Sequence, residues 1–128
     1  SIFNVGISIM NLEKQLNKDS ASDFWDAIDV LKENIKKDYS KFTTYEDGIK
    51  SFNAGLTMKV GKKYTKIINS NSVWGFIANG DGVLKGIPYF KGDVFKAAGW
   101  AAPAKHVRGS IFSSETNWFS WTGPRYLI

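Results

Sequence analysis

The sequence predicts an α+β fold in which N-terminal helices pack on a small, strongly bent antiparallel β-sheet or a partly open barrel. Two observations support this prediction. Apolar residues recur at helical spacing before Gly55 and at alternating positions after it, and ten of the twelve glycines lie at or beyond the same point. The 128 residues fit one domain. We therefore expect a helical half, residues 1–55, and a β-rich half, residues 56–128, to share one core, because their apolar faces must cover each other.

Two helices are expected in residues 20–55. The first begins at residues 20–23, where a serine can accept hydrogen bonds from the first turn. The second begins at Thr43 or Thr44, carries Tyr45 on its apolar face and ends at Gly55 in the left-handed conformation. We expect six apolar side chains to face the sheet, against rings such as Trp74, Phe76 and Phe95; these six are Phe24, Ile28, Leu31, Ile35, Ile49 and Phe52.

The β-rich half has the pattern of short strands joined by glycine turns. Strands are expected at 56–60, 64–68, 73–78, 94–97, 111–112 and 118–121, with an irregular or edge strand at 83–90. Residues 79–82 are expected to form a tight hairpin turn, and residues 103–109 a short helix with Pro103 in its first turn. The opening residues are ambiguous, and an extended start followed by a helix over about 10–17 is favoured.

Composition narrows the function classes. The chain has no cysteine and one histidine, which excludes disulfide scaffolds, thiol nucleophiles, Fe–S clusters and zinc sites built from cysteine or several histidines. No stretch approaches the roughly 20 apolar residues that span a bilayer, and the start lacks the features of a secretory signal. We therefore expect a soluble cytoplasmic protein with no membrane association, no metal and no cofactor, and we favour a role that is not enzymatic.

Charge is divided unevenly along the chain. Residues 1–55 carry seven Lys against nine Asp and Glu, a net −2, whereas residues 56–128 carry ten Lys and Arg against three acidic residues, a net +7. Such a basic half favours a salt-sensitive interaction with a polyanion, either single-stranded nucleic acid or another polyanion. Lysines beside aromatic residues in strands can meet phosphates while exposed rings stack on bases. Six large rings are candidates to fill the interior, and most of them are expected to do so: Trp74, Phe76, Phe95, Trp100, Trp118 and Trp121.

A second basic cluster lies in the expected short helix at 103–109. Lys105, His106 and Arg108 fall within one turn, where they form either an anion site, with Arg108 gripping two phosphate oxygens, or a solvated basic turn. As the one neutral-pH base, His106 is also a weak catalytic candidate for a small metal-independent nuclease or hydrolase. The candidate nucleic-acid or anion-binding residues are therefore Lys62, Lys63, Tyr64, Lys66, Lys96, Lys105, His106 and Arg108.

Protein interaction or assembly is the alternative function. Alternation along the expected strand at 118–121 places Trp118 and Ser120 on one face, and Phe119 and Trp121 on the other. We expect one of these faces to be uncovered, which would give an apolar patch rimmed by charge. The candidate contact residues are Trp118, Phe119 and Trp121.

Several segments of the β-rich half resemble a block in small uncharacterised proteins of tailed bacteriophages and environmental viral sequences. The resemblance covers about residues 56–128, and the segments that carry it are 62–67, 72–77, 92–100, 103–112 and 121–124. It implies expression in the cytoplasm of a bacterial host, where the interaction partner would be a host or phage protein. It transfers no activity and no catalytic residue.

Overall fold

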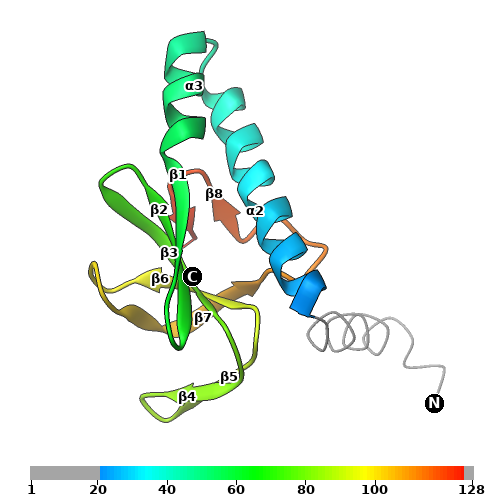
Figure 1. Cartoon of the computed structure of the whole chain (residues 1–128), viewed down its shortest axis with the longest axis vertical. Coiled ribbons are helices and arrows are strands. Elements are labelled where there is room, and N and C mark those ends of the chain that lie inside the picture. The colour runs from blue at the N-terminus through cyan, green and yellow to red at the C-terminus, as the bar shows by residue number, and fades with distance from the viewer. Residues whose placement is uncertain (1–20, 126–128) are drawn as a thin grey trace, which may run out of the picture.

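The computed structural model describes residues 21–125, so the expectations for residues 1–19 lie outside the described part of the chain. Within that part, two helices come first and short strands follow (Figure 1). The elements are α2 (Ala21–Phe42), α3 (Glu46–Gly55), β1 (Leu56–Val60), β2 (Tyr64–Asn69), β3 (Ser72–Ala78), β4 (Gly82–Leu84), β5 (Ile87–Tyr89), β6 (Asp93–Ala97), β7 (Pro103–Ser110), β8 (Phe119–Ser120) and β9 (Gly123–Pro124).

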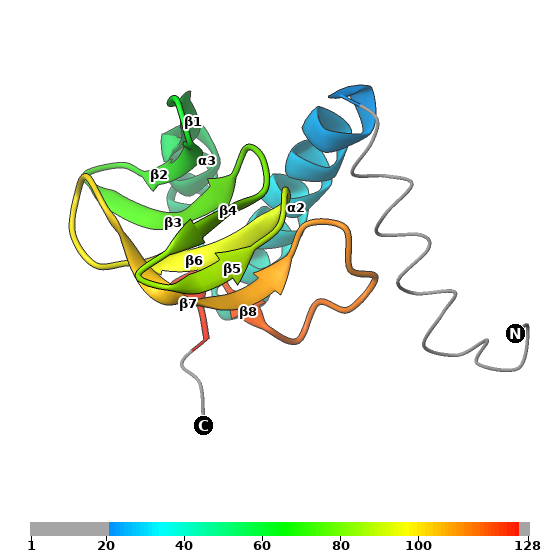
Figure 2. The ribbon, with the colours of Figure 1, turned by 90° about the horizontal axis from the view of Figure 1, so that it is seen from below.

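The predicted α+β class is confirmed. Five strands form one antiparallel sheet in the order β1-β2-β3-β6-β7, and the pairs β4–β5 and β8–β9 form two small separate sheets. The two helices lie together on one face of the large sheet (Figures 1 and 2). In the described chain no ladder joins β1 to β7, so the sheet is open and is not closed into a barrel.

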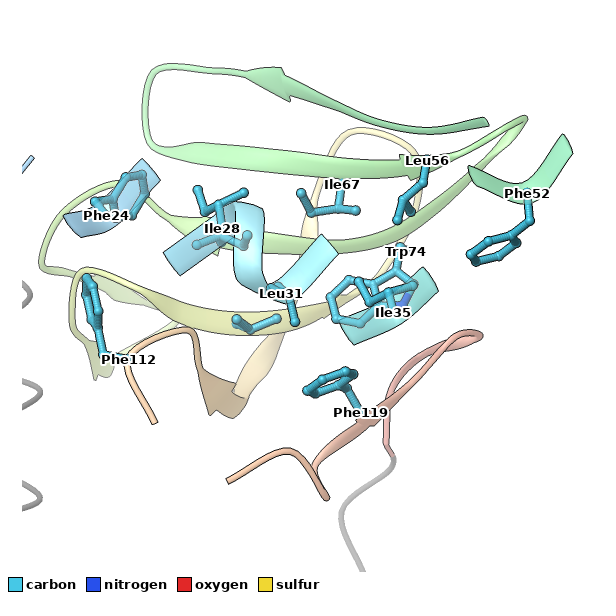
Figure 3. Packing of buried hydrophobic residues seen from close by; sticks show 12 residues of the cluster. Phe24, Ile28, Leu31, Ile35, Phe52, Leu56, Ile67, Trp74, Phe112 and Phe119 are labelled. Carbon is cyan, nitrogen blue, oxygen red and sulfur yellow. The ribbon is translucent and has the colours of Figure 1, made fainter. Parts of the chain in front are cut away.

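Helix α2 forms because apolar residues recur every three or four positions and charged residues occupy its other faces. Four predicted core residues are buried on its inner side: Phe24, Ile28, Leu31 and Ile35. Figure 3 shows these side chains directed at the sheet, where Ile67 of β2 is fully buried. Neither α2 nor α3 combines the length and the hydropathy that crossing a membrane requires.

Helix α3 differs from its prediction in three respects. It begins later, so Tyr45 precedes the helix with extended backbone and is 67% exposed. Phe52 is buried as predicted, whereas Ile49 is only half-buried, because α3 extends past the end of the sheet and mainly its last turn reaches the core (Figure 1). Gly55 ends the helix but is not left-handed; the chain runs directly into β1, and the missing side chain leaves room for the Ser70 hydroxyl.

A β-bulge decides which rings meet the helices. The register of β2 against β3 shifts between Ile67 and Ile68, which makes Trp74 an extra residue on β3. Its indole joins the helix-side core, and Nε1 donates a 2.9 Å hydrogen bond to a backbone carbonyl of β8. Phe76 and Phe95, predicted on the same side, lie in a separate cluster instead. That prediction is wrong because alternation along β3 does not continue through the bulge, and Phe95 shares the face of its cross-strand partner Phe76.

The hairpin β4–β5 packs on the face of the sheet opposite to the helices (Figure 2). Lys85 and Gly86 form its turn with φ angles of 51° and 82°, the two positive values that a type I′ turn requires. Segment 79–82 is therefore not the predicted hairpin turn but the connection from β3 to this hairpin, and the predicted strand at 83–90 is divided in two. The ring of Tyr89 covers this second core cluster.

Residues 103–110 form strand β7, so the predicted short helix is wrong. The segment pairs with β6 through a ladder with two irregularities, and this tertiary pairing overrides the local helix signal. Pro103 stands at the first strand position, where a missing N–H is tolerated. The predicted strand at 111–112 is a turn after β7, and the one at 118–121 is reduced to β8.

Candidate functional site

Four lysines gather around the β1–β2 hairpin. We call this set the lysine face: Lys59, Lys62, Lys63 and Lys66. They line an open hollow of about 230 Å³ together with Gly61, Tyr64, Phe76 and Ala101. The structure thus brings together four of the predicted binding residues, three lysines and Tyr64. Lys59 was not among them, although a hairpin that turns at 61–63 places it directly opposite Lys66.

The lysine face carries positive charge that the described chain leaves unneutralised. No acidic side chain lines the hollow, and none of the four lysines forms an ion pair with a carboxylate of residues 21–125. Lys59 and Lys66 are cross-strand partners, and like charges in that relation destabilise an antiparallel pair. An external anion placed between them would relieve this repulsion.

Two aromatic rings hold the ammonium group of Lys66. Its Nζ lies 4.4 Å from the centroid of the Trp100 ring and 5.8 Å from that of Phe76, both within cation–π range. Phe76 is buried, whereas Trp100 is 55% exposed and is therefore one of the large rings that do not fill the interior. Trp100 sits in the loop between β6 and β7, which closes through hydrogen bonds from the amides of Ala98 and Gly99 to the carbonyl of Ala102. The loop thus places the Trp100 indole against Lys66 of the lysine face.

Asn79 fixes the turn that carries two of the lysines. Its Oδ1 accepts a 2.6 Å hydrogen bond from the Thr65 hydroxyl, and its Nδ2 donates a 2.8 Å bond to the Gly61 carbonyl. Because a carbonyl can only accept, this contact also settles the orientation of the amide. The backbone amide of Asn79 donates to the Lys63 carbonyl at 2.9 Å. Sequence reasoning assigned Asn79 to a turn and missed this role.

A second hollow, of about 330 Å³, lies on the other side of the same turn. Lys62 and Lys63 border both hollows, and the second is completed by Tyr89 and residues 79–83. Tyr64 lies beside it, packed on Tyr89 with ring centroids 5.8 Å apart. Burial, the hydrogen bond with Tyr89 and the charge of Tyr89 together raise the pKa of Tyr64 to about 12. The Tyr64 hydroxyl is therefore neutral at physiological pH and adds no negative charge to the lysine face.

The remaining predicted anion-binding residues lie elsewhere and line neither hollow. Lys105 and His106 are exposed in the irregular part of β7, and within the described chain His106 has no hydrogen-bond or ion-pair partner to orient its ring. Arg108 Nη1 donates a 3.0 Å bond to the Arg125 carbonyl. Burial, and after it the charge of Arg108, lowers the pKa of Lys96. A helix turn that groups these side chains is absent, because the segment is a strand.

The aromatic residues at 118–121 pack against the helix-side core. Phe119 is 7% exposed, and Trp118 and Trp121 are half-buried against the helix-side core. Trp118 covers Gly109, and the backbone amide of Trp121 donates a 2.8 Å bond to a carboxylate oxygen of Asp38 on α2. The bare apolar face expected from alternation is therefore not formed by these rings, because the β8–β9 turn folds them onto the helices and sheet.

Residues 21–125 contain no group of three or more acidic, histidine or cysteine side chains that could hold a metal ion. Comparison with protein-family models matches residues 9–127 to the Family of unknown function (DUF7717). The chain belongs to this family. No curated protein and no solved structure matches it. The residues of this DUF7717 member are therefore the basis for its proposed function, and a phage origin stays a prediction.

Proposed function

We propose that this DUF7717 protein binds nucleic acid without catalysis, through contacts between the lysine face and the phosphate backbone. The observation that carries the proposal is the convergence of four lysines, two of them direct cross-strand partners, in a hollow without a carboxylate. A sheet that needed only solubility would gain by mixing acidic residues among these positions. Phosphate oxygens supply the missing negative charge.

The shape of the surface suits an extended polyanion better than a single small anion. Lys62 and Lys63 border both hollows, so a chain of phosphates can run along the first hollow and onto the turn. The Asp81 carboxylate lines the second hollow and disfavours phosphate there, so the contacts are confined to the lysine face. Asn79 holds that turn in place, which lowers the entropy lost when the lysines are ordered by a ligand. Each contact with a single-stranded backbone contributes about −0.7 to the slope of log K against log salt concentration, so four contacts give about −3.

The test is a fluorescence-anisotropy titration with labelled oligothymidylate at about 50 mM and about 200 mM salt. The triple variant Lys59→Gln/Lys62→Gln/Lys63→Gln removes three exposed charges and leaves Lys66 in its ring contacts. The matched control Lys37→Gln/Lys41→Gln/Lys50→Gln removes the same charge from exposed helix positions. We expect the first variant to bind weakly with a salt slope reduced by about 2, and the control to bind like the wild type.

Two results would overturn the proposal. Equal losses in both triple variants would mean that only net charge matters, and no binding by the wild type at the lower salt concentration would mean that the lysine face has no nucleic-acid ligand. A further variant, Lys105→Gln/His106→Gln, tests the exposed basic pair of β7. Loss of binding in that variant alone would move the site to β7.

A further inference from the structure

We propose that Trp100 makes the lysine face selective for single-stranded nucleic acid by stacking on one unpaired base. This inference rests on the proposed function, because it assigns the type of nucleic acid that the same surface takes. Its basis is the contact between the exposed Trp100 indole and the Lys66 ammonium group, 4.4 Å from the ring centroid, at the border of the lysine-lined hollow.

The position of Trp100 is not explained by packing. Aromatic rings of this size contribute most to stability when they are buried. Trp74 is buried in the core in this way, with 3% of its surface exposed. Trp100 instead remains 55% exposed at the tip of a loop that two backbone hydrogen bonds close. The Lys66 ammonium group lies over one face of the indole, so a base would stack on the opposite face. Little order has to be imposed by a ligand on an indole held in this way.

The pairing of Trp100 with Lys66 matches the chemistry of one nucleotide. A nucleotide joins a flat heterocycle to an anionic phosphate within one covalent unit, and this surface offers an indole and an ammonium group in contact with each other. Lys59, opposite Lys66, extends the positive charge toward the next phosphate. A polyanion without bases would contact the lysines but would have no group that stacks on the indole.

A duplex cannot use the indole in the same way. Its bases are stacked on both sides, so stacking on Trp100 would first require a base to be unstacked at a cost of a few kcal/mol. Duplex binding at this face is therefore limited to phosphate contacts. The structure thus predicts that the indole strengthens binding to single strands and leaves binding to duplexes and to inorganic polyphosphate unchanged.

The experiment compares three probes: labelled oligothymidylate, a labelled duplex of the same length, and inorganic polyphosphate as a competitor. Trp100→Ala is expected to weaken oligothymidylate binding by about 5- to 150-fold, which is the range for the loss of one stacked base. Trp100→Phe keeps a ring and should retain most of the affinity. Trp25→Ala, which removes a 38%-exposed indole from α2, is the matched control and should bind like the wild type. Circular dichroism and thermal melting verify that each variant is folded.

The outcomes separate this inference from the proposed function. If Trp100→Ala weakens all three probes equally, or none of them, while the triple lysine variant loses binding, the lysine face stands and the stacking role of Trp100 is overturned. If the wild type binds duplex as tightly as oligothymidylate, selectivity for single strands is overturned. If no probe binds at low salt, both proposals fail together.

Discussion

Asn79 connects the stability of the fold to the lysine face, and its removal has a calculable effect. Asn79→Ala deletes the acceptor of the Thr65 hydroxyl and the donor to the Gly61 carbonyl. Thr65 is 0% exposed, so its hydroxyl would remain buried without this partner, at a cost of about 1–3 kcal/mol. Loss of the bond to the exposed Gly61 carbonyl adds about 0.5–1.5 kcal/mol. We therefore expect Asn79→Ala to lower the free energy of unfolding by about 1.5–4.5 kcal/mol.

Urea denaturation of a double-mutant cycle measures this effect. Thr65→Val removes the hydroxyl that Asn79 satisfies. The double variant Thr65→Val/Asn79→Ala should therefore lose less unfolding free energy than the two single variants together, by at least about 1 kcal/mol. Asn79→Asp keeps the acceptor for Thr65 and loses only the donor, so it should cost less than Asn79→Ala. A cost below about 0.5 kcal/mol for Asn79→Ala, the range of an ordinary surface change, would refute the reasoning. Strict additivity in the cycle would refute the contact between the two side chains.

The remaining predictions concern the hydrophobic core, the close contact between Gly109 and Trp118, and the ionisation of Tyr64. Ile28→Ala, at a fully buried site, should cost about 2–5 kcal/mol in urea denaturation, whereas Val30→Ala, at a 59% exposed site on the same helix, should stay within about 0.5 kcal/mol. Gly109→Ala would place a methyl group against a half-buried indole and should cost about 1–3 kcal/mol, whereas Gly80→Ala meets open space; equal melting temperatures would contradict this. The raised pKa of Tyr64 stabilises the protein below pH 10, and this contribution is lost as pH rises from 10 to about 12. The free energy of unfolding should therefore fall across that window, and Tyr64→Phe should flatten the fall.

Helix α2 was predictable because its signal is local. The spacing of Phe24, Ile28, Leu31 and Ile35 defines one face without reference to any other segment. Tertiary contacts decided the elements that the sequence did not predict. Segment 103–110 has the proline and glycine positions of a short helix, but it lies against β6 and becomes a strand. The bulge at Trp74 likewise depends on the register with β2, and a single strand does not reveal it.

The candidate site was predictable to a similar extent. Lys62, Lys63 and Lys66 are neighbours in the sequence and in the hollow, and Lys59 follows from the hairpin register. Trp100 could not be placed, because its contact with Lys66 depends on how the loop between β6 and β7 returns to β2. The sequence groups Lys105, His106 and Arg108 on one helical turn, but this helix does not form, and a strand does not gather the three side chains on one turn.

The binding surface is tested most directly by nuclear magnetic resonance on the side-chain ammonium groups during titration with oligothymidylate. We predict that the Nζ resonances of the lysine face, Lys59, Lys62, Lys63 and Lys66, shift with increasing oligonucleotide, while those of Lys37, Lys41 and Lys50 on the helices stay in place. Shifts confined to the helix lysines, or to Lys105 on β7, would contradict the assignment of the site. Uniform small shifts at all lysines would show that the charge of the β-rich half acts without a defined surface.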